Sequence, residues 1–217
     1  EPSALVALLV LDRIPDFIYL ASQSPRRSQL REQLGVRHTL LVPNTDGDVA
    51  EDAEGLEVVF KNEAPATYVA RVTGLKLDAA VLRHKRRKLP AAPILCSDTT
   101  VAVGRNILGK PADAAEAASM LRALSGTTHR VLTAVAVQQG RKRVQALSVS
   151  KVTFAVLTLA QIRAYVASGE PMGKAGAYAV QGRAAAFIEH ISGSYSGIMG
   201  LPMFEAAQLL RSVGIKV

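Results

Sequence analysis

The sequence predicts an α/β protein with a mixed sheet, built as one domain with two lobes about a cleft. Short apolar runs typical of strands alternate with segments of helical periodicity along most of the 217 residues. Adjacent apolar runs within 100–108 and within 129–156 are separated only by turn residues, so they indicate antiparallel hairpins among the crossovers. The chain is 49% hydrophobic and 20% charged, which allows a large core.

The N-terminal part of this pattern is a strand followed by a helix. Phe17–Ala21 is a short apolar run with two aromatic residues and predicts a buried strand. Ser24 followed by Pro25 is typical of a helix start, because a hydroxyl caps the first turn and proline has a preset φ angle. Gly35 predicts the end of this helix. A helix that begins directly after a strand presents free N–H groups and a positive dipole end to an anion.

Side chains that suit a phosphate surround this predicted helix start. Ser22 and Ser24 offer hydroxyl groups, and Arg26 and Arg27 offer planar guanidinium groups. These residues therefore suggest a phosphate site. An ordinary capped helix with solvated arginines is the alternative, and these residues alone do not separate the two.

A strand over 39–42, an acidic loop over 44–57 and a helix over 65–82 are expected next. The loop has the composition of a surface flap, and its carboxylates could supply a metal ligand. Lys76 lies among the apolar positions of the helix, where a lysine is usually solvated or extends along apolar surface.

An acidic residue follows the next apolar run. Ile94–Cys96 predicts a buried strand that leads into Ser97, Asp98 and Thr99. α/β proteins often place catalytic groups at the carboxyl end of a core strand, which makes Asp98 a candidate. The alternative is that Asp98 caps a turn.

The segment 104–111 has the glycine and lysine spacing of a phosphate-binding Walker A loop. Pro111, however, replaces the hydroxyl residue that would hold magnesium, and it has no N–H to donate. The segment also follows a predicted hairpin turn, so we reject this interpretation. Lys110 could still contact a phosphate.

The second half of the chain is expected to hold helices, a long hairpin and a glycine-rich segment. In the glycine-rich segment 173–182 the backbone can approach a ligand closely, and the amide of Gln181 could read the edge of a base. A flexible linker is the alternative reading of this segment. The other expected elements are a helix over 113–124, paired strands over 129–137 and 144–156, a helix after Thr158, a strand over 186–191, a turn over 193–196 and a last helix after 200–202.

Charge and cysteine content limit the class of protein. A net charge of +8 favours polyanionic partners, but the basic run 83–88 has no interleaved aromatic residues and is expected to be a solvated loop. Cys96 is the one cysteine, which favours a reducing, cytoplasmic location. The apolar stretch 4–11 is too short for a membrane span and lacks a basic leader, so 1–16 is expected to be an extension and 17–217 the domain.

From Tyr19 to the C-terminus, the order of several motifs resembles the Maf family of nucleoside triphosphate pyrophosphatases, most closely its dTTP/UTP branch. The resemblance implies an elongated, bilobed α/β fold related in shape to inosine-triphosphate pyrophosphatases, and a homodimer. The motifs are Ser22–Arg27, Ser97–Thr99, Leu108–Pro111, Leu124–His129, Gly169–Pro171, Lys174–Tyr178, Gln181–Gly182, Gly193–Tyr195 and Gly200–Pro202.

The same resemblance implies hydrolysis of dTTP and UTP to the monophosphate and pyrophosphate with Mg²⁺ or Mn²⁺. By this similarity Asp98 would accept the proton, and it is the best-placed carboxylate for the metal. It could orient the water, act as the base or bind a metal that does so, and the sequence does not separate these roles. Arg27, Lys76 and Lys110 match residues expected near the phosphates, beside Ser22 and Ser24. Arg26, Thr99 and Gln181 match positions linked with substrate choice. Such chemistry needs positive charge more than covalent catalysis.

One departure from the family pattern affects the metal. An acidic pair usually follows the second strand, whereas here Asp46 is followed by Gly47, and the acids are displaced to Asp48, Glu51 and Asp52. We interpret this as a local insertion that leaves the metal ligand of the loop undefined.

Two other functions stay open at this stage. One is a nucleotide-binding or nucleic-acid-binding protein without turnover, for which the basic run 83–88 would be responsible. The other follows the family's association with house-cleaning of nucleotides, septum formation and arrest of cell division, and it rests on analogy alone.

Overall fold

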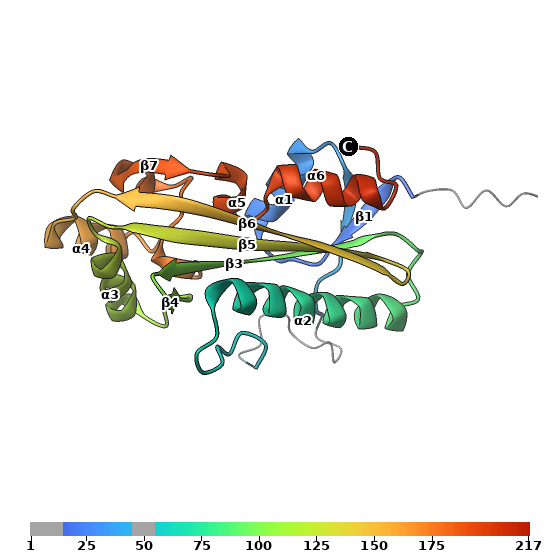
Figure 1. Cartoon of the computed structure of the whole chain (residues 1–217), viewed down its shortest axis with the longest axis horizontal. Helices are drawn as coiled ribbons and strands as arrows, with labels where there is room; N and C mark the ends of the chain where they lie inside the picture. Colours follow the sequence, from blue (N-terminus) through green and yellow to red (C-terminus); the bar gives the residue numbers. More distant parts are fainter. Residues whose placement is uncertain (1–14, 45–54) are drawn as a thin grey trace, which may run out of the picture.

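The computed structural model describes residues 15–44 and 55–217, so most of the expected extension and most of the acidic loop lie outside the described residues. The described chain forms a 7-stranded mixed sheet with strand order β2-β1-β3-β5-β6-β7, and β4 pairs with β3. Helices flank this elongated sheet (Figure 1). The prediction of an α/β fold with a mixed sheet is confirmed. Within the described residues, no helix combines the length and apolarity needed to cross a membrane.

The elements follow one another in the order that the periodicity indicates. The N-terminal half contains β1 (Phe17–Leu20), α1 (Pro25–Gln33), β2 (Arg37–Leu40), α2 (Pro65–Arg86), β3 (Ile94–Val103), β4 (Asn106–Leu108) and α3 (Ala114–Leu124). The C-terminal half contains β5 (Thr128–Gln139), β6 (Lys142–Phe154), α4 (Leu159–Ala167), the 3₁₀ turns η1 (Ala175–Ala177) and η2 (Arg183–Phe187), β7 (Ile188–Ser192), α5 (Tyr195–Met199) and α6 (Met203–Ser212).

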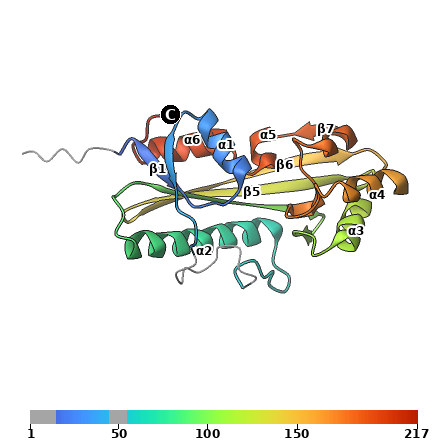
Figure 2. The ribbon, with the colours of Figure 1, turned by 180° about the vertical axis from the view of Figure 1, so that it is seen from behind.

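The sheet separates two helical layers. Helix α2 lies along one face, against β3 and β5, while α5 and α6 pack on the other face against β5 and β6 (Figures 1 and 2). Helices α3 and α4 pack together at the end of the molecule that is farther from β1. The long β5–β6 hairpin therefore forms the spine that both layers share.

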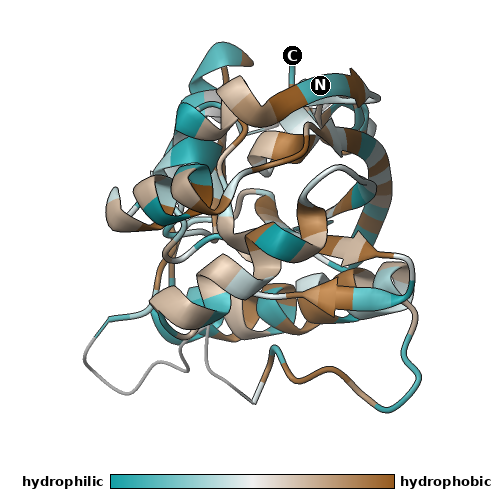
Figure 3. Cartoon of the chain, turned by 90° about the vertical axis from the view of Figure 1, so that its left-hand side faces the viewer, coloured by the Kyte–Doolittle hydropathy of each residue, from teal (hydrophilic) through white to brown (hydrophobic). Residues whose placement is uncertain are grey.

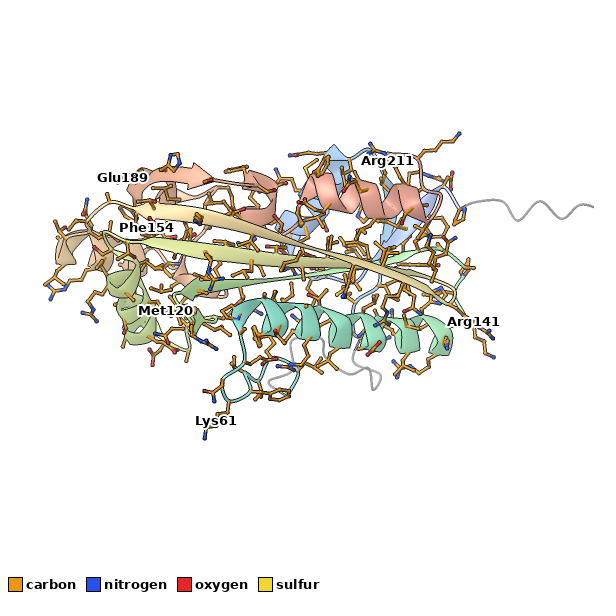
Figure 4. The ribbon with its side chains drawn as sticks, viewed as in Figure 1. Lys61, Met120, Arg141, Phe154, Glu189 and Arg211 are labelled. Carbon is orange, nitrogen blue, oxygen red and sulfur yellow. The ribbon has the colours of Figure 1, made fainter. Side chains whose placement is uncertain are left out.

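Apolar side chains fill both sides of this spine. The largest cluster includes Leu121 of α3, Phe154 of β6 and Leu210 of α6, and a second cluster contains Leu77 of α2 and Cys96 of β3. Hydrophobic and hydrophilic residues alternate along the curved strand at the right of Figure 3, as expected of a strand with one covered face. Lys61 and Arg141 point away from the body of the molecule (Figure 4).

One edge of β3 is left open between two partners. Strand β1 runs parallel to β3 and pairs only at Ile94 and Leu95, whereas β4 pairs antiparallel at Val101–Val103. Along this edge no described strand pairs with residues 97–100. The gap lies beside the carboxyl end of β1, where the chain turns into α1, which is the type of crevice where α/β proteins bind ligands.

The structure corrects several expected element boundaries. Strand β2 lies two residues before the expected 39–42, and Asp98 lies in the middle of the ten-residue β3, not at its carboxyl end. Strand β7 begins two residues later than expected, because 183–187 form a 3₁₀ turn. The expected turn over 193–196 includes the start of helix α5, which Ser194 caps by accepting a hydrogen bond from the N–H of Gly197.

The basic run 83–88 was wrongly expected to be a solvated loop. Its first half continues α2 to Arg86, and Arg83 is buried. Arg83 donates a hydrogen bond to the carbonyl of Leu41 at 3.1 Å, and Arg87 donates to that of Val42 at 2.9 Å. These arginines therefore tie the end of α2 to the segment after β2.

His129 lies deep between the hairpin and the glycine-rich segment. Its Nε2 is 2.6 Å from the hydroxyl of Tyr178, and its ring stacks edge-on against Phe154. The side chain is only 1% exposed. Burial lowers the pKa of His129 to about 4, so the folded protein keeps this ring neutral at physiological pH.

This buried histidine predicts a loss of stability in mild acid. The unfolded chain binds a proton on His129 below about pH 6.5 while the folded chain does not, so the free energy of unfolding falls between about pH 6.5 and 4, by about 3 kcal/mol. Urea denaturation across this range measures it. His129→Gln, which cannot titrate, removes this part of the pH dependence, whereas His190→Gln on exposed β7 retains it. An unchanged slope in His129→Gln would contradict the assignment.

Candidate active site

A cavity of about 450 Å³ lies at the open edge of β3. The β1–α1 connection, β3, the segment 173–181 and the end of α5 form its walls. The structure brings together in it every residue that the sequence singled out for catalysis or binding: Ser22, Ser24, Arg26, Arg27, Lys76, Asp98, Thr99, Lys110 and Gln181.

The β1–α1 connection forms one wall and is held by the hydroxyl of Ser22. This hydroxyl accepts hydrogen bonds from the N–H of Ser24 and from a terminal nitrogen of Arg27, both at 3.2 Å. The Nε of Arg27 donates to the carbonyl of Gly200 at 2.9 Å. Arg27 therefore joins the first helix to the turn between α5 and α6 and is fixed in the cavity wall.

Positive charge is concentrated on this side of the cavity. Burial, and then the neighbouring charge of Arg27, lower the pKa of Arg26. Burial and the charge of Arg26 likewise lower the pKa of Lys174, which the sequence had not singled out as a site residue. Cations placed against one another and away from water stabilise an anion bound between them. The phosphate-site interpretation of this helix start therefore has electrostatic support.

Lys76 occupies the opposite side, and its expected solvated position is wrong. The residue is 4% exposed, and its Nζ lies 2.9 Å from Asp98 Oδ1 and 2.9 Å from Glu57 Oε1. Burial alone would lower the pKa of Lys76, but the charges of Asp98 and Glu57 outweigh it and raise this pKa above its ordinary value. Lys76 thus remains protonated between two carboxylates.

Glu57 is, beside Lys174, a second residue of the site region that the sequence did not single out. The displaced acids Asp48, Glu51 and Asp52 lie outside the described residues, whereas Glu57, the last acid of the loop, reaches Lys76 and lies 3.5 Å from Lys110 Nζ. Nothing in the local sequence distinguishes it from the other acids of this loop.

Contacts from α2 fix the backbone around Glu57. The hydroxyl of Tyr68 donates to the carbonyl of Glu57 at 3.0 Å, and Arg71 donates to the carbonyl of Val58 at 2.6 Å. The guanidinium of Arg71 also lies 3.9 Å from the centre of the Phe60 ring. Two residues one helical turn apart on α2 therefore hold the end of the loop, and with it Glu57, at the cavity.

The donor set fits a divalent cation. Asp98 and Glu57 both contact one ammonium group, so their carboxylates are close enough to share a cation, and carboxylate oxygens are ligands that Mg²⁺ and Mn²⁺ prefer. Within the described parts of the chain, no group of three or more His, Cys, Asp or Glu side chains that could hold a metal ion is found, so these two carboxylates are the candidate ligands.

The glycine-rich segment is an ordered wall, so the flexible-linker alternative is wrong. Glu170 holds it, accepting hydrogen bonds from the hydroxyl of Tyr165 at 2.7 Å and from the N–H of Arg183 at 3.1 Å. A Cβ at Gly182 would overlap the Glu170 carboxylate, so a larger residue there would have to displace this carboxylate from its hydrogen bonds. Gln181, which precedes Gly182, is exposed and lines the cavity.

The structure agrees with the rejection of the Walker A interpretation of 104–111. Gly104 has a φ of +58° and forms the tight turn of the β3–β4 hairpin, and its carbonyl accepts a hydrogen bond from Arg130. The segment therefore does not wrap a phosphate. Lys110, just after β4, nevertheless lines the cavity.

These features define a class of α/β protein with a polyphosphate-binding type of pocket at an open strand edge. Arg26 and Arg27 make one wall of this pocket positive, and the carboxylates of Asp98 and Glu57 contact Lys76 beside it. The family model described as Maf-like protein matches residues 17–213, and this chain belongs to that family. The resemblance stated from the motifs is thereby confirmed.

Individual relatives are similar over nearly their whole length. A dTTP/UTP pyrophosphatase of Albidiferax ferrireducens is 71% identical over 202 residues, which cover 93% of this chain and 99% of the relative. One of Polaromonas sp. is 70% identical over 202 residues, 93% of this chain and 98% of the relative. One of Cupriavidus pinatubonensis is 60% identical over 201 residues, with the same coverage of 93% and 98%.

The carboxylate pair predicts a metal-sensitive stability. Lys76→Met leaves the buried Asp98 facing Glu57 without a positive charge between them, so we expect the free energy of unfolding to fall by about 3 kcal/mol in metal-free buffer. Added Mg²⁺ or Mn²⁺ should restore more stability to the variant than to the unmodified protein, because the cation replaces the ammonium. Denaturant titrations with and without metal measure both effects.

Lys61→Met is the control for this experiment, since Lys61 is exposed away from the cavity. Its stability and its response to metal should match those of the unmodified protein. A Lys76→Met variant that is destabilised but insensitive to both metals would show that the two carboxylates do not form a cation site.

Proposed function

We propose that this chain hydrolyses dTTP and UTP to the nucleoside monophosphate and pyrophosphate. The observation that carries the proposal is that the ion-paired Lys76 and Asp98 line the same cavity as Arg26, Arg27 and Lys110, while Glu57 contacts Lys76 beside it. Relatives at 56–71% identity that bear the name dTTP/UTP pyrophosphatase support the substrate.

The cationic wall is proposed to bind the triphosphate. A triphosphate carries several negative charges, and further charge develops on its oxygens as the bond to the α-phosphorus breaks. Arg27 is held by Ser22 and Gly200 before substrate arrives, so little reorganisation is needed on binding. Ser24 and the N-terminus of α1 lie beside it, while Lys110 reaches the cavity from the other side.

Asp98 is proposed as the proton acceptor. The oxygen of a water molecule forms the new bond to the α-phosphorus, the bond from this phosphorus to the bridging oxygen breaks, and the proton of the water passes to the Asp98 carboxylate. Lys76 donates a hydrogen bond to Asp98 Oδ1 and thereby fixes the orientation of the carboxylate. The departing pyrophosphate takes the electron pair of the broken bond.

Asp98 and Glu57 would hold the divalent cation that the family resemblance implies. A bound Mg²⁺ or Mn²⁺ supplies positive charge that withdraws electrons from the phosphoryl oxygens.

Arg26, Thr99 and Gln181 are proposed to determine which base is accepted. A homodimer that acts in the cytoplasm is part of the same proposal.

For the alternative of nucleic-acid binding without turnover, the basic run 83–88 offers less than its composition suggests. Arg83 and Arg87 of the basic run 83–88 donate to the carbonyls of Leu41 and Val42, so these arginines have structural partners. For the association with septum formation, we find no supporting feature among residues 15–44 and 55–217.

Asp98→Asn tests the proposal. The amide keeps the shape of the side chain but cannot accept the proton, so kcat for pyrophosphate release from dTTP or UTP should fall by about 10³-fold. Asp78→Asn is the matched control, since Asp78 pairs with Arg143 on the exposed side of α2. The assay measures pyrophosphate and orthophosphate separately over a panel of nucleoside triphosphates with Mg²⁺ or Mn²⁺.

A folded Asp98→Asn variant with full activity would exclude Asp98 as the proton acceptor. Release of orthophosphate by the unmodified protein would place the cleavage at the terminal phosphate and overturn the reaction itself.

A further inference from the structure

We propose that Thr133, a residue of β5 behind the cavity wall, positions the Thr99 hydroxyl so that it can only accept a hydrogen bond, and thereby selects bases that present an N–H. This inference rests on the proposed function and deepens it. Thr133 does not line the cavity and is 0% exposed, so it acts through Thr99 and is a positioning residue.

The two threonines face each other across neighbouring strands. Thr99 of β3 and Thr133 of β5 are direct partners in the antiparallel register, and their hydroxyl oxygens are 2.9 Å apart. The Thr133 hydroxyl also lies 2.6 Å from the carbonyl oxygen of Gly197 in α5. A buried hydroxyl therefore lies between the cavity-lining Thr99 and a main-chain carbonyl.

Counting protons assigns the direction of both hydrogen bonds. A carbonyl oxygen cannot donate, so the single proton of the Thr133 hydroxyl goes to Gly197. Thr133 has no second proton, so Thr99 must be the donor in the bond between the two hydroxyls. The proton of Thr99 thus points away from the cavity, and its oxygen presents only lone pairs there.

An acceptor at this place is a poor partner for phosphate. Phosphate oxygens are themselves acceptors, and the cavity supplies donors for them at Arg26, Arg27 and Lys110. Thr99 therefore faces a donor on another part of the substrate. The base N–H between the two carbonyls is a donor that UTP and dTTP share, whereas cytosine has a bare acceptor nitrogen at this position.

The two threonines together then discriminate between these bases. An N–H of uracil or thymine forms a hydrogen bond to Thr99, while the ring nitrogen of cytosine would meet a lone pair and lose its hydration without compensation. A threonine hydroxyl that was free to rotate could donate to cytosine as readily as it accepts from uracil. Thr133 removes this freedom.

Replacement of Thr133 by valine tests the inference. Thr133→Val keeps the shape but cannot accept the proton of Thr99, so the ratio of kcat/KM for UTP over CTP should fall about tenfold, mainly through a gain with CTP. Thr133→Ser retains the hydroxyl and should keep the original ratio. Thr73→Val is the control for loss of a buried hydroxyl, since Thr73 donates to the carbonyl of Val69 within α2 and lies outside the cavity lining.

A binding assay separates this inference from the proposed function. Calorimetry with the α,β-methylene analogues of UTP and CTP measures the same preference without turnover, so it remains informative if the protein releases no pyrophosphate. Thr99→Val provides a second variant that should lose the preference, should Thr133→Val fail to fold.

Several results would overturn the proposal. An unchanged UTP-to-CTP ratio in folded Thr133→Val, in both assays, would show that Thr133 does not control the base. An equal loss with both nucleotides would assign the Thr99 hydroxyl to the sugar, whose 3′-hydroxyl is common to all of these substrates. A fall in the ratio with Thr73→Val as large as with Thr133→Val would indicate a general effect of stability.

Discussion

The structure around the cavity depends on a single buried ammonium group. Asp98 and Glu57 compensate for the lost hydration of Lys76 inside the protein. The two ion pairs link α2, β3 and the end of the acidic loop, beside the apolar contacts that pack α2 on the sheet. Tyr68 and Arg71, which hold the backbone at Glu57 and Val58, lie on the same helix, so α2 positions the cation and one of its carboxylate partners together.

The open edge of β3 gives this ion cluster access to a ligand. Pairing of β3 with β1 ends at Leu95, and its pairing with β4 begins at Val101. Ser97, Asp98 and Thr99 lie between these points, and all three line the cavity, so both faces of β3 are next to it there. Had β1 been longer, its backbone would have filled the gap. The shortness of β1 is therefore a functional feature, and the turn after it supplies the helix N-terminus and the arginines.

The sequence predicted the order and type of nearly all elements, because local periodicity, capping residues and glycines determine them. Residues that form the cavity could be predicted from motifs that lie far apart in the chain. The contact of Glu57 with Lys76 could not be predicted, because it depends on where Tyr68 and Arg71 hold the backbone of an irregular loop. The burial of Arg83 was missed for a similar reason: its partner is the carbonyl of Leu41, 42 residues away, and main-chain acceptors carry no sequence signal.

Alternation along β3 separates the two tasks of the site. Successive side chains of a strand point to opposite faces, so Asp98 faces α2 and contacts Lys76, while Ser97 and Thr99 face α5 and its following turn. The Ser97 hydroxyl lies 2.9 Å from the carbonyl oxygens of both Ala134 and Gly200. The Gly200 carbonyl also accepts from Arg27, and Thr99 bonds to Thr133. Two adjacent residues thus connect the cavity to opposite sides of the sheet. Asp98 contacts Lys76 of α2, in an ion cluster suited to proton transfer. Thr99 contacts the Thr133 hydroxyl, which donates to Gly197 of α5, and this pair is proposed to fix the direction of a hydrogen bond. A one-residue shift in the register of β3 would exchange the faces of Asp98 and Thr99 and abolish both proposed roles, so the long pairing of β3 with β5 keeps these faces distinct.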